Sequence, residues 1–283
     1  MPMNKWIVGA RLRTLPAAIA PVLVATAYAG SNWEPIRAFS ALLVSLALQI
    51  GVNYANDYSD GIRGTDDSRI GPVRLTASGL ASPKAVRTAA QISFLFAAVI
   101  GLTLAIATSW WIILVGALAI NAAWGYTGGA NPYGYKGLGE ISVFLFFGIV
   151  ATTGSYFVQT EELNLEIFII AIPMGSLACA ILAINNLRDR AQDQIVGKRT
   201  LAVRLGDRGA RRLYIALLIS AHIFALLTFK QAALLTLLAT PLTWSLARGV
   251  SRGVNGGDLI PYLAKTGKLQ LVFAILFALG LAI

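Results

Sequence analysis

Aspartate and asparagine side chains gather near the ends of two long apolar stretches of this sequence. Only 13 of its 283 residues are Asp or Glu, and six of these lie in the two windows. Carboxylates are costly beside a lipid bilayer, so this placement needs a reason. It predicts Mg²⁺ ions that hold a phosphate-bearing substrate. The first group is Asn53, Asn56, Asp57 and Asp60, with Asp66 and Asp67 just beyond it, and the second is Asn185, Asn186, Asp189 and Asp193.

The spacing within each group predicts that its members share one helix face. The first group falls at i, i+3, i+4 and i+7, and three members of the second fall at i, i+4 and i+8. Residues at these spacings form one stripe along a helix. Two such helix ends side by side would form a bowl of oxygen ligands for Mg²⁺, which takes the rest of its shell from water and phosphate. The alternative is a pair of solvated helix ends with capping residues.

Basic residues follow both groups along the chain. Guanidinium and ammonium groups neutralise the charge of a departing diphosphate. Together with Mg²⁺ they predict the ionisation of an allylic diphosphate, whose carbocation is then caught by a nucleophile inside an apolar cavity that excludes water. Further along, Arg208, Arg211 and Arg212 are expected to be membrane anchors. The candidate diphosphate-binding cations are Arg63, Arg69, Arg74, Arg188, Lys198 and Arg199.

A third segment, residues 126–140, is rich in glycine and aromatic residues. The rings of Tyr126 and Tyr135 could face a cation through their π clouds. Lys136 could meet a substrate carboxylate or the diphosphate. The alternative is an aromatic belt at the membrane interface joined to a loop.

The elements that carry these groups must be membrane helices. Apolar residues make up 57% of the chain and charged ones 13%, with a mean hydropathy of +0.69. Soluble domains are typically about 45–50% apolar and about 25% charged. The net charge of +10 does not indicate nucleic-acid binding, because the basic residues border apolar stretches. The single cysteine excludes an intrachain disulfide, and the single histidine is expected to be structural.

Nine apolar segments are expected to cross the membrane as helices, because backbone groups in lipid must bond internally and the alternation of a barrel is absent. The first could pass for a signal peptide, but the equally apolar remainder favours a membrane helix. The segments run over Leu15–Ala29, Ala38–Tyr54, Val86–Ile106, Trp110–Tyr126, Ile141–Val158, Phe168–Leu187, Leu213–Phe229, Gln231–Leu246 and Leu269–Ile283.

The basic residues also predict the orientation of the chain. With nine spans, 21 of the 23 Lys and Arg residues fall on the side of the N-terminus, and only Arg37 and Lys230 fall on the other. The positive-inside rule makes the populated side cytoplasmic, and both acidic groups lie there too. Residues 1–283 are read as one membrane domain with a weak internal repeat, because each group ends an even-numbered helix and leads into a basic loop.

The two acidic motifs resemble those of the UbiA superfamily of intramembrane aromatic prenyltransferases. The resemblance rests on Asn53-x-x-Asn56-Asp57-x-x-Asp60 and Asn186-x-Arg188-Asp189-x-x-x-Asp193, which occur in this order in a nine-span chain. The stretches 10–16, 56–66 and 197–206 are similar to the branch of menaquinone synthesis. The similarity extends from about residue 9 to about residue 206, and the last three helices match only in hydropathy.

This resemblance implies an all-helical ring of nine spans around a central cavity that opens sideways to lipid. Two Mg²⁺ ions are expected to bridge a polyprenyl diphosphate between the two motifs. The implied acceptor is 1,4-dihydroxy-2-naphthoate, which loses CO₂ as it is prenylated and becomes demethylmenaquinone. The expected setting is the cell membrane, with the active site on the cytoplasmic side.

The resemblance also implies roles for individual residues. One departure is Gly64, where the 4-hydroxybenzoate branch usually has a further Asp; Asp66 is expected to take its place, with Asp67 as the alternative. The implied contacts to the cation or the acceptor are Tyr126, Tyr135 and Lys136. The implied Mg²⁺ ligands are Asp57, Asp60, Asp66, Asp189 and Asp193. The implied diphosphate ligands are Asn53, Asn56, Arg69, Arg74, Asn185, Asn186, Arg188, Lys198 and Arg199.

Three other interpretations remain at this stage. The first is a related enzyme with another acceptor, such as 4-hydroxybenzoate, homogentisate or haem, or with a phosphoribosyl donor. The second is an ion-coupled transporter, which the scarcity of ionisable groups in the middle of the spans disfavours. The third is a catalytically silent membrane scaffold, which leaves the arrangement of carboxylates unexplained.

Overall fold

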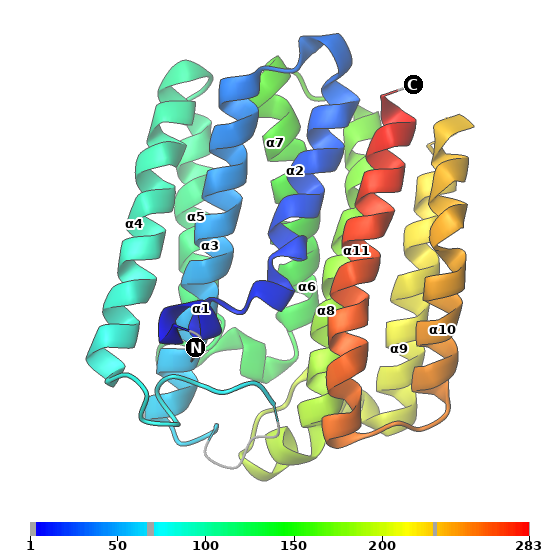
Figure 1. Cartoon of the computed structure of the whole chain (residues 1–283). Coiled ribbons are helices and arrows are strands. Elements are labelled where there is room, and N and C mark those ends of the chain that lie inside the picture. Colours follow the sequence, from blue (N-terminus) through cyan, green and yellow to red (C-terminus); the bar gives the residue numbers. More distant parts are fainter. Residues whose placement is uncertain (1–3, 67–70, 229–230, 283) are drawn as a thin grey trace.

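The computed structural model describes residues 4–66, 71–228 and 231–282, in which long helices stand side by side (Figure 1). These residues contain no β-strand, which confirms the all-helical expectation. The chain begins with the short helices α1 (Lys5–Ala10) and η1 (Leu12–Thr14). The main elements that follow are α2 (Pro16–Ala29), α3 (Pro35–Ile62), α4 (Pro83–Ala107), α5 (Trp111–Gly125), α6 (Gly139–Val143), η4 (Phe144–Val150), α7 (Ala151–Thr160), α8 (Leu165–Ile195), α9 (Leu201–Leu226), η5 (Gln231–Ala239), α10 (Thr240–Ser251) and α11 (Ile260–Leu281).

Among the described residues, seven helices are long and apolar enough to cross a bilayer. The N-terminal pair Lys5–Thr14 and Pro16–Asn32, bent by 52°, makes an eighth candidate if it counts as one span. The remaining expected span, α5, is an apolar helix of only 15 residues. About 20 residues are needed to cross about 30 Å of hydrocarbon, so α5 by itself falls short of that length. The seven are Pro35–Ile62, Pro83–Ala107, Gly139–Thr160, Leu165–Ile195, Leu201–Leu226, Ala233–Ser251 and Gly256–Leu281.

The start of each long helix is encoded locally. α3 and α4 both begin with a proline, whose fixed φ suits the first helical position. The Glu34 carboxylate accepts from the Arg37 N–H at 2.8 Å, and the Ser82 hydroxyl accepts from the first turn of α4. In α8 the Asn164 side chain accepts from the backbone of Ile167 at 2.9 Å. Each cap satisfies a backbone donor that the helix itself leaves unpaired.

The helices α3 and α8 are both longer than the sequence analysis predicts. α3 continues to Ile62 and α8 to Ile195, eight residues beyond each expected end. Both acidic groups therefore lie within the last turns of a continuous helix rather than just after one. A rigid helix holds its side chains at fixed angles, so the spacing of each group translates directly into direction.

The main hydrophobic core surrounds α8. In the apolar 18-residue stretch of this helix, 78% of the residues are buried. Residues such as Met174 and Ile184 pack there against α2, α9 and α11. Helix η4 also approaches α8 closely, because a Cβ atom at Gly148 would lie 2.4 Å from the Cα of Gly175. Residues 139–160 form one helical span, called here the α6–α7 rod, that comprises α6, η4 and α7. Residues 144–150 within it form a π-helix, whose turns are wider than those of the expected α-helix and which is often found at functional sites. The core thus makes α8 a fixed wall against which the site is built.

Candidate active site

One cavity of about 1030 Å³ lies between the helices α3, α4, α5 and α8 and the α6–α7 rod. Most of its wall is apolar, with side chains such as Leu48, Phe146 and Phe147. Its polar lining includes residues of both acidic motifs. A mostly apolar cavity with a few convergent polar groups is the usual form of a small-molecule site.

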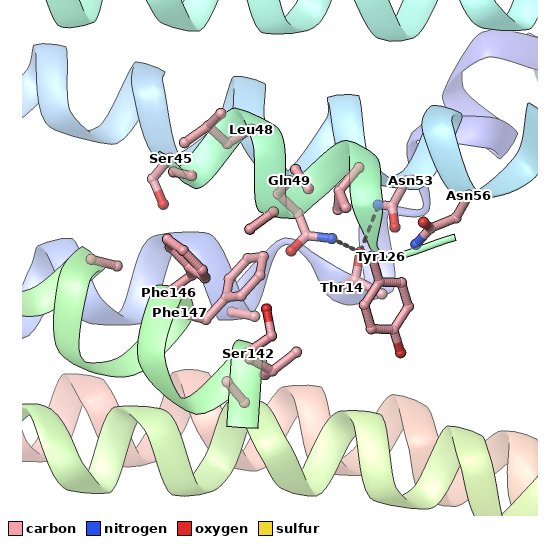
Figure 2. Close-up of a pocket in the computed structure, with 18 of the residues that line it drawn as sticks. Thr14, Ser45, Leu48, Gln49, Asn53, Asn56, Tyr126, Ser142, Phe146 and Phe147 are labelled. Carbon is pink, nitrogen blue, oxygen red and sulfur yellow. Dashed lines mark hydrogen bonds between the residues drawn. The ribbon is translucent and has the colours of Figure 1, made fainter. Parts of the chain in front are cut away.

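The α3 wall carries a polar stripe along the cavity. Ser45, Gln49, Asn53, Asn56 and Asp60 recur every three or four residues and all line it. Five of the labelled side chains in Figure 2, Ser45, Leu48, Gln49, Asn53 and Asn56, come from this helix. This stripe continues the spacing seen in the first motif for about two turns further into the membrane helix.

Lys198 connects Asp60 of the first acidic group to Asp193 of the second. The Oδ1 of Asp60 accepts from the Tyr135 hydroxyl at 2.5 Å and lies 3.1 Å from the Lys198 Nζ. Lys198 follows α8, and its backbone N–H donates to the carbonyl of Asp193 at 2.8 Å. This turn brings a cation from the end of α8 onto the carboxylate of α3.

The charges around Lys198 affect its protonation. Burial lowers the pKa of Lys198, but the negative charges of Asp60 and Asp193 outweigh that effect and hold the pKa above its ordinary value. Burial, followed by the charge of Asp60, raises the pKa of Tyr135. Lys198 therefore stays a cation at neutral pH, and Tyr135 stays a hydrogen-bond donor.

The α8 wall presents Asn185, Asn186, Asp189 and Asp193 to the same cavity. Arg188 holds both carboxylate oxygens of Asp189, from Nε and Nη2, at 2.7 Å. Its Nη2 also donates to Asn185 Oδ1 at 2.8 Å. Such a two-pronged contact fixes the carboxylate in orientation as well as position.

Two buried guanidinium nitrogens near the cavity have no hydrogen-bond partner among the described residues. They are Nη1 of Arg74 and Nη1 of Arg188. The other side of Arg74 is taken up, because its Nε lies 3.1 Å from Asp66 Oδ2. A buried N–H donor without an acceptor is costly, so these groups fit an anionic ligand.

Asp57, an expected Mg²⁺ ligand, is not part of the cavity lining. Its side chain is fully buried. The two carboxylate oxygens accept from the backbone N–H groups of Leu75 and Thr76 at 2.8 and 2.9 Å. Asp57 is one residue, about 100° around the helix, beyond Asn56, and that rotation turns it to the loop after α3.

Other expected site residues are also absent from the cavity lining. Arg188 is one of them, although it is buried and bonded to Asp189, which does line the cavity. Lys136 and Arg199 are exposed and are not part of its lining. Asp66 is buried beside Arg74 rather than at the cavity wall. The expected roles of Asp67 and Arg69 lie outside the described residues. Tyr126 and Tyr135 line the cavity, as do all four expected asparagines.

Gly64 is the position at which the resemblance implies a further aspartate in the 4-hydroxybenzoate branch. Its φ of +69° lies in the left-handed region, which favours glycine. The helix α3 ends just before it, so the chain turns there and does not continue the stripe. The backbone thus explains why this position does not supply a carboxylate.

Several cavity residues were missed by the sequence analysis. Gln49 lies four residues before Asn53, so extending the stripe by one turn would have found it. Arg11 and Thr14 also line the cavity, from the break between α1 and α2. Glu140 accepts from Asn186 at 3.0 Å behind the α8 wall. Arg11, Thr14 and Glu140 lie on other elements than the motifs, so no spacing rule links them to the motifs.

The donor set fits Mg²⁺ together with a diphosphate but not as a metal site made by protein alone. No cluster of three or more His, Cys, Asp or Glu side chains suited to a metal occurs among the described residues. Asp60, Asp189 and Asp193 do line one cavity with buried cations beside them. Mg²⁺ usually takes one or two carboxylates plus substrate phosphates, and this arrangement matches that habit.

The fold is that of a multi-pass membrane protein, and its cavity joins an apolar interior to buried carboxylates and cations. The chain belongs to the UbiA prenyltransferase family, whose model matches residues 18–255. The 1,4-dihydroxy-2-naphthoate octaprenyltransferase of Mycobacterium tuberculosis is 48% identical over 98% of this chain and 97% of its own. The enzyme of the same name from Escherichia coli is 38% identical over 98% and 94%.

Solved structures show the same fold at low sequence identity. A UbiA homologue from Archaeoglobus fulgidus, bound to GPP and Mg²⁺, aligns with a TM-score of 0.71 at 14% identity over 99% of each chain. The same homologue bound to DMAPP and Mg²⁺ aligns with a TM-score of 0.68 at 15% identity, again over 99% of each chain. At these identities the alignments establish the architecture.

Proposed function

We propose that this protein transfers a polyprenyl group from polyprenyl diphosphate to 1,4-dihydroxy-2-naphthoate, releasing diphosphate and CO₂ and giving demethylmenaquinone. The observation that carries the proposal is one cavity that joins carboxylates of two helices and buried cations to a long apolar interior. The near-full-length relatives named for this reaction support the choice of acceptor.

The diphosphate is held at the polar end of the cavity. The unpartnered nitrogens of Arg74 and Arg188 and the ammonium group of Lys198 supply positive charge. Asn56 adds an amide N–H, because its Oδ1 already accepts from the Thr127 hydroxyl at 2.7 Å. All these groups donate, which suits the oxygens of an anion.

Mg²⁺ would be held by Asp60, Asp189 and Asp193, and it supplies Lewis-acid stabilisation of the departing diphosphate. Each of these carboxylates is at least nine-tenths buried. Asp60 and Asp189 are paired with Lys198 and Arg188. Those cations also offer positive charge to the phosphate oxygens when the ligand enters.

Transfer begins when the C–O bond to the allylic carbon breaks. The diphosphate leaves with the electron pair of that bond, and the allylic carbon becomes a cation. The ring carbon that bears the carboxylate attacks the allylic cation, and CO₂ then leaves and returns its electron pair to the ring. Because CO₂ leaves in place of a proton, that ring carbon needs no general base. The apolar lining excludes water, and Tyr126 and Tyr135 present aromatic rings to the cation.

We further propose that all nine apolar segments span the membrane as one domain, with α5 completed by its flanking residues. The acidic ends of α3 and α8 then face the cytoplasm together with most basic residues, by the positive-inside rule. The cell membrane is the expected site, since the prenyl tail enters from lipid.

The proposal is tested with purified protein in detergent, a long-chain prenyl diphosphate, 1,4-dihydroxy-2-naphthoate and Mg²⁺, with and without EDTA. The expected result is a prenylated quinol with CO₂ released in equal amount, abolished by EDTA. Turnover with 4-hydroxybenzoate in place of the naphthoate would overturn the acceptor while keeping the class. No product with any aromatic acceptor would overturn the proposal as a whole.

A further inference from the structure

The middle of the cavity presents hydrogen-bond acceptors, in contrast to the donors at its polar end. This follows from counting the hydrogens in two chains of hydrogen bonds. The first begins at the break between α1 and α2, where Arg11 has a left-handed φ of 52°. At the break, the Ala10 carbonyl accepts from Asn53 on α3, and the Arg11 carbonyl accepts from the backbone N–H of Thr14 at 2.8 Å.

In the first series of hydrogen bonds, Thr14 determines the orientation of the side-chain amides of Gln49 and Asn53. Its hydroxyl donates its one hydrogen to the Arg11 carbonyl at 2.9 Å. The groups that face its oxygen must therefore be donors. They are Nε2 of Gln49 at 3.1 Å and Nδ2 of Asn53 at 3.0 Å, and the latter also donates to the Ala10 carbonyl at 2.9 Å. Figure 2 shows both bonds converging on Thr14.

The oxygen of Gln49 consequently faces away from Thr14. Gln49 lines the cavity, and its Oε1 has no hydrogen-bond partner among the residues that the structure describes. In Figure 2 the nitrogen of Gln49 is directed at Thr14 and its oxygen lies on the opposite side. One Nε2 hydrogen of Gln49 is used at Thr14, and the unpartnered Oε1 is the acceptor that this side chain offers a ligand.

A second chain leads to Ser142 on the other wall. The Tyr133 hydroxyl donates its hydrogen to the Ala122 carbonyl at 2.7 Å. Ser142 lies 2.8 Å from the same hydroxyl, so Ser142 must be the donor in that pair. With its hydrogen used, the Ser142 oxygen can only accept from a ligand, and this side chain also lines the cavity.

We infer that Gln49 Oε1 and Ser142 Oγ bind the aromatic acceptor through its ring hydroxyl groups, and that Gln49 determines specificity for a hydroxylated ring. The inference rests on the proposed function and adds a subsite to it. Gln49 lies eleven residues before Asp60, about 16 Å along the helix axis, which leaves room for the diphosphate and a ring in line. The rings of Phe146 and Phe147 line the same part of the cavity wall.

The chemical consequence is selectivity for hydrogen-bond donors. A ring that lacks the hydroxyl leaves a buried amide oxygen without a partner, which sites of this kind penalise strongly. A methoxy group, which only accepts, is penalised in the same way. Naphthoates with free hydroxyls are therefore bound, and their methyl ethers are rejected.

The test measures inhibition constants of naphthoates against the acceptor, with and without each ring hydroxyl and as methyl ethers. In the unmodified enzyme, loss of one hydroxyl is expected to weaken inhibition about tenfold or more. Gln49→Met, of similar volume, is expected to abolish the discrimination at that hydroxyl. Gln49→Glu, which still accepts, is expected to retain it.

Two controls separate this inference from the function itself. The KM for prenyl diphosphate reports on folding and on the polar end, and it should be unchanged in Gln49→Met. Asn121→Leu removes an exposed amide on α5 outside the lining and should change nothing. If the unmodified enzyme turns over and Gln49→Met still discriminates as before, the inference is wrong and the function stands. If the unmodified enzyme is inactive, the function itself is wrong.

Discussion

The two acidic motifs look alike in sequence but are used differently. Both follow Asn-x-x-x-Asp spacing, from Asn53 to Asp57 and from Asn185 to Asp189. On α8 the aspartate faces the cavity and is held by a neighbouring arginine. On α3 the corresponding aspartate is turned to the backbone of the following loop, and Asp60 takes the place at the cavity.

The difference shows that a carboxylate near a site can serve the site in two ways. One way is to face the ligand. The other is to hold the segment that carries a ligand-binding group, as Asp57 holds the backbone of Leu75 and Thr76, directly beside Arg74. Separating these uses experimentally tests the whole assignment.

The largest effect is expected where the two motifs meet at the cavity. Asp60→Asn and Asp193→Asn should each lower turnover about 10²–10³-fold, because each removes negative charge that holds Mg²⁺ against the diphosphate. Their thermal unfolding in detergent should change little. Steady-state kinetics with saturating Mg²⁺ measures the loss. A large effect in one helix alone would break the picture of a shared site.

A smaller loss is expected for the cation between the motifs. Lys198→Met removes a charged donor beside Asp60 and should weaken prenyl diphosphate binding about 10- to 100-fold. Lys136→Met is the matched control, because that side chain is exposed and outside the cavity lining. Equal effects in both variants would contradict the placement of Lys198.

Asp57→Asn should act on stability before it acts on chemistry. The amide keeps one oxygen acceptor but turns an N–H₂ group toward a backbone donor, at a cost of about 1–3 kcal/mol. The unfolding temperature should fall, while turnover per folded molecule falls far less than in Asp60→Asn. If the variant is as stable as the parent protein but inactive, this assignment is wrong and Asp57 is a metal ligand.

The smallest effect is expected at the end of α3. Gly64→Ala places a Cβ atom at a φ of +69°, which costs about 1–2 kcal/mol. The unfolding midpoint should fall modestly with kcat unchanged. Gly64→Asp should show the same loss without gaining activity, because α3 ends before this position and the helical spacing of the stripe does not continue to it. Increased activity in that variant would contradict this placement.

Much of this arrangement could be predicted from spacing and composition. The polar stripe, the second motif and the all-helical fold follow from periodicity, since an apolar chain must form helices and spacing defines a face. The role of Asp57 could not be predicted, because a rotation of one residue and a loop 18 residues later decide it. That Lys136 and Arg199 lie outside the cavity lining could not be predicted for a similar reason, because a basic residue in a loop carries no periodicity that indicates its direction.

The most direct test measures Mg²⁺-dependent binding of an unreactive prenyl thiolodiphosphate to the parent protein and to Asp60→Asn, Asp193→Asn and Asp57→Asn. The account predicts that the two cavity variants, one from each helix, both lose Mg²⁺-dependent binding, and that folded Asp57→Asn keeps it. If Asp57→Asn loses binding as completely as Asp60→Asn while Asp193→Asn retains it, the shared site between α3 and α8 is contradicted.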